Sequence, residues 1–126
     1  MILKPKNLIN VILFILLILQ ACTNTYYVDG ELGNNANSGT SPEKPWKTLE
    51  PVNALKLLPG DKILLKAGCE YAGTLAPHGS GTERSPIIID SYGEGTKPVI
   101  AGNGKTENVI RLHNQRFLVS WINKNK

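Results

Sequence analysis

The sequence predicts an all-β parallel solenoid, in which the first two to three coils follow one short N-terminal helix. Two series of apolar segments recur at a common period of about 23 residues, which is typical of a structural repeat. Glycine-rich segments at 79–82, 93–95 and 102–104 lie where the backbone of a coil must turn sharply. A leucine-rich repeat has a similar period, but the sequence lacks its recurring Leu and Asn framework and its helical return. The first series is Ile63-Leu64-Leu65, Ile87-Ile88-Ile89 and Ile110-Arg111-Leu112, and the second is Thr74-Leu75 and Pro98-Val99-Ile100.

A short amphipathic helix is predicted over residues 49–57, before the first coil. Thr48 is a suitable N-cap, and Pro51 falls in the first turn, where its missing N–H costs little. Apolar residues recur at helical spacing at Leu49, Val52 and Leu55. Because the open end of a solenoid exposes its core and unpaired backbone groups, we expect this helix to cover the first coil.

Length and charge exclude several classes of protein. A chain of 126 residues forms one domain at most. Its net charge of +4 divides into +2 over residues 1–21, −2 over residues 22–110 and +4 over residues 111–126. The body of the protein is therefore mildly acidic. No basic stripe with interleaved aromatic residues is present, so we do not expect nucleic acid as a partner.

The N-terminus has the pattern of an export signal. Lys4 and Lys6 precede an apolar run from Leu8 to Leu19, which is shorter than the roughly 20 residues needed to span a bilayer. The following Ala21-Cys22 resembles the lipobox of bacterial lipoproteins, with Cys22 as the lipidated residue, although Gln20 departs from the usual small residue. In the alternative interpretation, an ordinary signal peptidase cleaves nearby. We expect a protein of the bacterial cell envelope, periplasmic or surface-facing, held on the membrane by acyl chains.

These patterns predict three segments: a lipoprotein signal peptide at 1–21, a tether with a capping strand and loop at 22–47, and the capping helix with an incomplete β-helix at 48–126. The third coil begins at Val109, and its alternation decays after Leu118-Val119. We therefore expect the chain to be the N-terminal fragment of a longer solenoid protein.

Five motifs in order resemble the N-terminus of right-handed parallel β-helix proteins of the pectate-lyase-like superfamily. The resemblance covers about residues 26–114. It implies an exported bacterial protein that acts on acidic polysaccharide, as a lyase in the first place and as a glycoside hydrolase in the second. The motifs are Tyr26-Tyr27-Val28-Asp29, the segment from Gly33 to Pro42, Pro45-Trp46-Lys47-Thr48-Leu49, Leu58-Pro59-Gly60-Asp61-Lys62-Ile63, and Gly79-Ser80-Gly81-Thr82 before Pro86-Ile87.

The resemblance also implies that catalytic groups lie several coils further along than this chain extends. Elimination from a uronate needs a group that neutralises the carboxylate and a base over the C5 proton. We therefore assign no catalytic residue and no metal ligand, and we expect the chain alone to be inactive. No cofactor is expected in this fragment, whereas Ca²⁺ is possible in full-length relatives. Two alternatives remain open: a non-catalytic module that binds carbohydrate or a surface, and an inactive remnant.

The remaining polar and aromatic residues are expected to have mostly structural roles. Oxygens at Asp29, Asn34, Asn35 and Asn37 suit Ca²⁺, but their spacing lacks the order of a calcium loop. Trp46 is expected to anchor the helix on the first coil rather than stack on sugar, and Cys69 to be a small buried hydrophobe rather than a nucleophile. The other candidates, expected to be solvated or to satisfy coil corners, are His78, Arg84, Asp90, Arg111 and His113, with Tyr71 as a second possible sugar platform.

Overall fold

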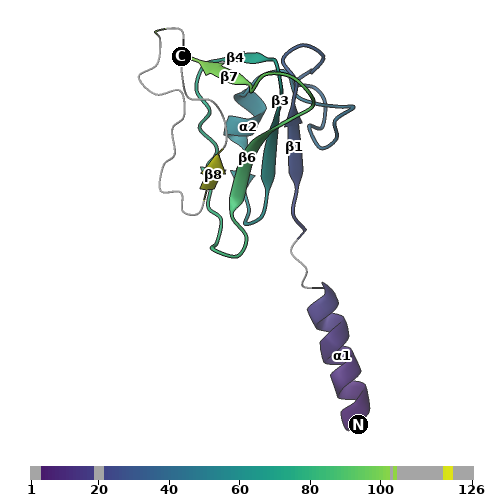
Figure 1. Cartoon of the computed structure of the whole chain (residues 1–126). Coiled ribbons are helices and arrows are strands. Elements are labelled where there is room, and N and C mark those ends of the chain that lie inside the picture. Colours follow the sequence, from purple (N-terminus) through teal and green to yellow (C-terminus); the bar gives the residue numbers. More distant parts are fainter. Residues whose placement is uncertain (1–3, 19–21, 103, 105–117, 121–126) are drawn as a thin grey trace.

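The computed structural model describes residues 4–18, 22–102, 104 and 118–120. Apart from two helices, the body consists of short strands in three sheets (Figure 1). The helices are α1 (Pro5–Ile18) and α2 (Glu50–Ala54). The strands are β1 (Thr25–Val28), β2 (Lys56–Leu57), β3 (Lys62–Lys66), β4 (Glu70–Ala72), β5 (His78–Gly79), β6 (Ile87–Tyr92), β7 (Val99–Ala101) and β8 (Leu118–Ser120).

The strands stack as the turns of a solenoid. The largest sheet has the order β1-β3-β6-β8, and two small sheets pair β4 with β7 and β2 with β5. Every strand pair among the described residues is parallel. The chain visits the three sheets in turn, since β3, β4 and β5 are followed by β6 and β7. The prediction of a parallel, solenoid-like β architecture is thus confirmed.

The register differs from the predicted one. Ile63 pairs with Ile89 rather than with Ile87. The second predicted series was wrong, because β4 at 70–72, not Thr74-Leu75, is the partner of β7. Residues 110–112 lie outside the described residues. The strand beside β6 is β8, where Ile87 pairs with Leu118.

The core lies between the sheets and is filled by alternate residues of each strand. The side chains of Ile63 and Leu65 in β3 are fully buried, and so are those of Ile87 and Ile89 in β6. Burial of one such side chain stabilises the fold by about 1.5–3 kcal/mol. The expectation that Ile63 and Ile87 share one interior is confirmed, since both belong to one apolar cluster. That cluster also includes Val28, Trp46, Leu49, Val52, Leu57, Cys69, Tyr71, Leu75 and Ile100.

Helix α2 is shorter than predicted. It ends at Ala54, because Leu55 is extended with ψ 145°, and Leu57 belongs to strand β2. The helical spacing of Leu49, Val52 and Leu55 continues at Leu58, which is exposed and lies beyond the end of the helix. Thr48 is not the N-cap; that position is Leu49. Thr48 Oγ1 accepts the Asn35 amide at 2.7 Å and, more weakly, the Glu50 N–H at 3.4 Å.

Helix α2 nevertheless lies beside residues 74–76, which follow β4. Val52 is fully buried on its inner side. The Asn53 amide donates to the Thr74 carbonyl at 2.8 Å and accepts from the Ala76 N–H at 2.7 Å. The side-chain amide of Asn53 therefore makes the two hydrogen bonds to residues 74–76 that the backbone of a neighbouring parallel strand would otherwise make.

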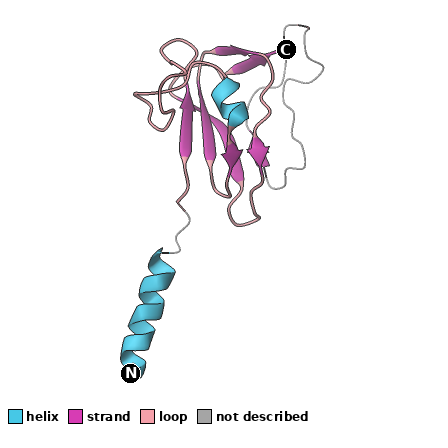
Figure 2. Cartoon of the chain, turned by 180° about the vertical axis from the view of Figure 1, so that it is seen from behind, coloured by secondary structure: helices cyan, strands magenta, loops and turns pink. Residues whose placement is uncertain are grey.

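The apolar side chains of the N-terminal helix α1 are exposed, and the helix lies away from the β body in Figure 2. Leu13 and Leu16 are each 59% exposed and Phe14 is 65% exposed, so α1 makes little use of the β body for burial. Within the described residues, no helix has the length and apolarity needed to cross a membrane.

Candidate functional site

The asparagine-rich loop between β1 and α2 folds around Trp46. The indole Nε1 donates to the Asn37 carbonyl at 2.7 Å, and the ring stacks on Tyr26 with centroids 5.5 Å apart. Backbone bonds from Tyr27 to Gly39 and from Trp46 to Tyr27 place the loop along the outer edge of β1. Trp46 is only 7% exposed and stacks on Tyr26, which removes its ring face from any sugar; its role as an anchor of the helix on the first coil stays a prediction.

The four residues considered for Ca²⁺ hold this loop together instead. Asp29 Oδ1 accepts the Glu31 and Leu32 N–H groups at 2.9 and 3.0 Å. Asn34 and Asn35 also accept backbone N–H groups, from Ala36 and from Lys47 and Thr48 respectively. Asn37 donates its amide to the Pro45 carbonyl. Among the described residues, no group of three His, Cys, Asp or Glu side chains is placed to hold a metal ion.

Asp61 is a buried carboxylate that was not among the residues predicted from the sequence. It is 1% exposed, and its two oxygens accept the Asn24 and Leu58 N–H groups at 2.8 Å each. The carboxylate thus ties the start of β1 to the turn between β2 and β3. Its position in Pro59-Gly60-Asp61, where Gly60 has a φ of +88°, was a usable signal, because a buried Asp after a tight turn commonly accepts backbone N–H groups.

The tyrosines are more buried than their sequence suggests. Tyr71 is 3% exposed, and its hydroxyl donates to the Val28 carbonyl and accepts the Lys66 N–H, so it is not a sugar platform. Burial raises the pKa of Tyr71 strongly, with the Cys69 thiol as a smaller cause. Burial raises the pKa of Tyr92 to about 12, and the nearby Asp29 carboxylate adds to this. Among the described residues, no group bonds to the buried Tyr92 hydroxyl.

The other predicted candidates do not converge. His78 is exposed in β5 and Arg84 is exposed in the turn before β6. Asp90 was expected to satisfy a coil corner, but it lies within strand β6 opposite Leu64 and accepts the N–H of its neighbour Ser91 at 2.7 Å. Arg111 and His113 lie outside the described residues.

The two cysteines have different surroundings. Cys69 is 5% exposed within the apolar cluster, as predicted for a small buried hydrophobe, and its Sγ lies 3.9 Å from Asp29 Oδ1. Cys22 is a free, exposed thiol after α1. An exposed thiol is accessible to a modifying enzyme, whereas Cys69 is not.

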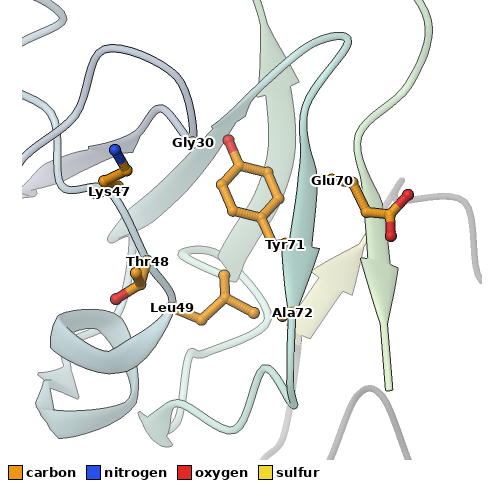
Figure 3. A pocket seen from close by; sticks show the side chains of 7 residues that line it. All are labelled: Gly30, Lys47, Thr48, Leu49, Glu70, Tyr71 and Ala72. Carbon is orange, nitrogen blue, oxygen red and sulfur yellow. The ribbon is translucent and has the colours of Figure 1, made fainter. Parts of the chain in front are cut away.

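A groove runs along the edge of β4 that faces away from β7. One part, with a volume of about 190 Å³, lies between the segment 47–49 and β4 (Figure 3). A second part of about 350 Å³ continues between α2 and residues 72–74. Tyr71 and Leu49 form the floor, and the Glu70 carboxylate points away from the groove in Figure 3. We call this feature the β4-edge groove; it is lined by Gly30, residues 47–50, Asn53 and residues 70–74.

Glycoside hydrolysis uses two carboxyl groups on either side of the scissile bond, roughly 5–10 Å apart. The buried carboxylates Asp29 and Asp61 are both occupied by backbone N–H groups. The β4-edge groove offers mainly backbone polar groups, which suit binding rather than catalysis.

Comparison with other proteins gives relatives among glycosidases. The chain is 44% identical over 86 residues to a lacto-N-biosidase of Bifidobacterium longum subsp. longum, a match over 64% of this chain and 5% of the relative. It is 35% identical over 70 residues to alpha-1,3-galactosidase A of Akkermansia muciniphila, over 56% of this chain and 12% of that protein. No protein-family model matches the chain.

A solved structure resembles the chain as well. The crystal structure of the GH136 lacto-N-biosidase from Eubacterium ramulus superposes with a TM-score of 0.57 at 41% identity, over 60% of this chain and 12% of that one. The chain thus spans about a twentieth to an eighth of the length of these relatives. Its relatives are glycoside hydrolases with a β-rich, solenoid-like fold, which supports a carbohydrate-active protein.

Proposed function

We propose that this chain forms the first coils of an exported glycoside hydrolase with a right-handed parallel β-helix. The observation that carries the proposal is the 44% identity to a lacto-N-biosidase, together with the 41% identity to a superposable GH136 structure. The parallel sheets and the hydrogen bonds from Asn53 of α2 to residues 74 and 76 support a capped β-helix.

Hydrolysis is the better supported of the two reactions that the sequence suggests. All three relatives are glycosidases, whereas lyase action on acidic polysaccharide rests on the motif resemblance alone. Hydrolysis needs an acid and a second carboxylate, and the catalytic pair is proposed to lie on coils outside the described residues. The role of this segment is then to cover the end of the β-helix and to hold the following coils in register. The chain alone is expected to be inactive.

A chimeric enzyme tests this role. The matched segment of the Eubacterium ramulus lacto-N-biosidase is replaced by the corresponding residues of this chain, and hydrolysis of a chromogenic lacto-N-bioside is measured. The chimera is expected to fold and to hydrolyse the substrate, because the stacking surface offered to the next coil is equivalent. A second chimera with Asp61→Ala serves as the control and is expected to lose folded, active protein. A first chimera without folded protein would contradict the proposed role.

We further propose that the protein is exported and anchored through Cys22. The support is the basic and apolar N-terminus, the exposed apolar surface of α1 and the exposed Cys22 thiol that follows it. Each methylene of an acyl chain that enters a bilayer contributes about 0.8 kcal/mol, so several chains hold a protein on a membrane.

The Cys22→Ser variant is expected to lose the label in cells fed radioactive palmitate and to leave the membrane fraction. Cys69→Ser is the matched control for the thiol itself, and it should keep both the label and the membrane association. Equal labelling of the Cys22→Ser variant and the natural chain would remove the lipid anchor from the proposal.

A further inference from the structure

We propose that the β4-edge groove binds one ring of a neutral oligosaccharide. The inference deepens the proposed function, because it names a sugar-binding site on coils that we expect to lack catalysis. The choice of a saccharide as the ligand rests on the proposed function. The position of the site rests on the backbone geometry of β4.

The first step concerns the direction of the β4 backbone groups. The Cys69 carbonyl accepts the Val99 N–H at 3.0 Å, and the Gly73 N–H donates to the Ala101 carbonyl at 2.9 Å. Since backbone groups alternate in direction along a strand, Tyr71 bonds to β7 between these two, and Glu70 and Ala72 point their N–H and C=O groups the other way. Two donors and two acceptors therefore face the groove, and no described residue bonds to them.

The second step is that this stretch of free edge is closed at both ends. The Asn53 amide occupies the backbone of Thr74 and Ala76 beyond Ala72. At the other end lies Gly30, and a Cβ built there would be 3.5 Å from the Tyr71 ring and 3.7 Å from the Glu70 carbonyl. Because a strand rises about 3.3 Å per residue, the open edge is short. It suits a compact ligand better than an extended peptide.

The third step concerns the character of the walls. Leu49 and Tyr71 lie beneath the groove but are each only 3% exposed, so the groove offers a ligand mainly the backbone groups of Glu70 and Ala72, with Lys47 and Thr48 at its rim (Figure 3). A pyranose ring has the matching character, because its hydroxyl groups both donate and accept hydrogen bonds. Among the described residues that line the groove, Lys47 is the one cation, and the Glu70 carboxylate points outward, so no cluster of basic groups is present there to hold a uronate.

The volume of the smaller part of the groove, between residues 47–49 and β4, suits a single sugar ring. Sites for drug-sized molecules measure about 300–1,000 Å³, so about 190 Å³ suits a ligand fragment of one ring. The adjoining volume of about 350 Å³ leaves room for the next unit of the chain.

The experiment is an NMR titration of the detergent-solubilised full chain with lacto-N-biose, with glucuronic acid and a Thr-Val-Thr tripeptide as comparison ligands. Lacto-N-biose is expected to shift the amide signals of Glu70 and Ala72 at millimolar concentration and to slow their hydrogen exchange. Shifts produced by glucuronic acid or the tripeptide, without shifts from lacto-N-biose, would overturn the proposal.

Gly30→Leu is designed to fill the groove. The contacts of its Cβ at 3.5–3.7 Å are ordinary, and no positive φ stands at this residue, so the variant is expected to fold. It should weaken saccharide binding by roughly tenfold. Ala54→Leu adds a similar side chain on the exposed side of α2 and should leave binding unchanged.

Equal affinity of Gly30→Leu and the natural chain would place the sugar elsewhere and overturn the inference. A negative titration overturns the inference too but leaves the hydrolase proposal standing, because that proposal is tested by the activity of the chimera. An inactive chimera combined with saccharide binding at β4 would support the groove while favouring the non-catalytic binding module.

Discussion

The Asp61→Ala variant is expected to lose about 3–5 kcal/mol of unfolding free energy, because two backbone N–H groups lose a charged acceptor inside the protein. Asn24 and Leu58 each donate to this carboxylate at 2.8 Å, and Asp61 is 1% exposed, so water does not replace it. Small domains have about 5–15 kcal/mol in total. The loss therefore removes a large part of the stability. Urea denaturation followed by circular dichroism measures it.

Two further variants separate the bonds from the charge. Asp61→Asn keeps one accepting oxygen and should lose about half as much. Glu94→Ala removes an exposed carboxylate and should change the free energy of unfolding by less than about 0.5 kcal/mol. If Asp61→Ala were as stable as Glu94→Ala, the tie between the start of β1 and the β2–β3 turn would not contribute to the fold.

The Gly39→Ala variant is expected to cost roughly 3 kcal/mol or more, because its methyl group would meet the Trp46 ring. A Cβ built at this residue would overlap ring atom Cε2 of Trp46, and the residue has a φ of +70°. The ring has little freedom to move, since its Nε1 bonds to Asn37 and its face stacks on Tyr26. Thermal unfolding monitored by circular dichroism gives the shift in Tm.

Gly68→Ala is the matched control for the backbone. Gly68 has a similar φ of +80°, but nothing lies within 4 Å of a Cβ built there. It should therefore cost only the left-handed backbone strain of about 1–2 kcal/mol. Equal losses for the two variants would show that contact with Trp46 does not constrain the loop.

The sequence predicted the kind of architecture better than its register. The recurrence of apolar segments at Ile63 and Ile87 indicated stacked parallel strands, and both side chains are buried in one core. The observed partners are Ile63 and Ile89 in the large sheet, and Tyr71 and Ile100 between β4 and β7. The spacing along the chain therefore differs from sheet to sheet. Each sheet is separated from the next by turns of independent length, so a single period read from apolar segments misplaces individual strands.

Strand β4 illustrates why the second series failed. Of its three residues, only Tyr71 is buried, so the strand carries no apolar run that a sequence pattern detects. Leu75 is buried and apolar, yet the chain has already left the β4–β7 ladder there. The end of α2 was misplaced for a similar reason, because Leu55 and Leu58 continue the helical spacing of Leu49 and Val52 although the helix ends at Ala54.

The sequence likewise indicated the surroundings of some site residues but not the position of the groove. Cys69 is the small buried residue that its neighbours in sequence indicate, and Trp46 is buried where it ties the asparagine-rich loop to Tyr26. The β4-edge groove was not predicted, because it is formed by backbone groups of Glu70 and Ala72. Every residue type carries these groups, so no sequence pattern marks them. Its walls come from two separate segments, 47–50 and 70–74, and only the register brings them together.

The activity of the chimeric lacto-N-biosidase tests the central claim most directly, that these residues form the opening coils of a glycoside hydrolase. Hydrolysis by a folded chimera, with kcat/KM within roughly tenfold of the parent enzyme, is the expected result, because remote packing changes of this kind cost little in the transition state. A soluble chimera whose catalytic coils are folded but whose activity is lost, while the parent remains active in the same assay, would contradict the claim.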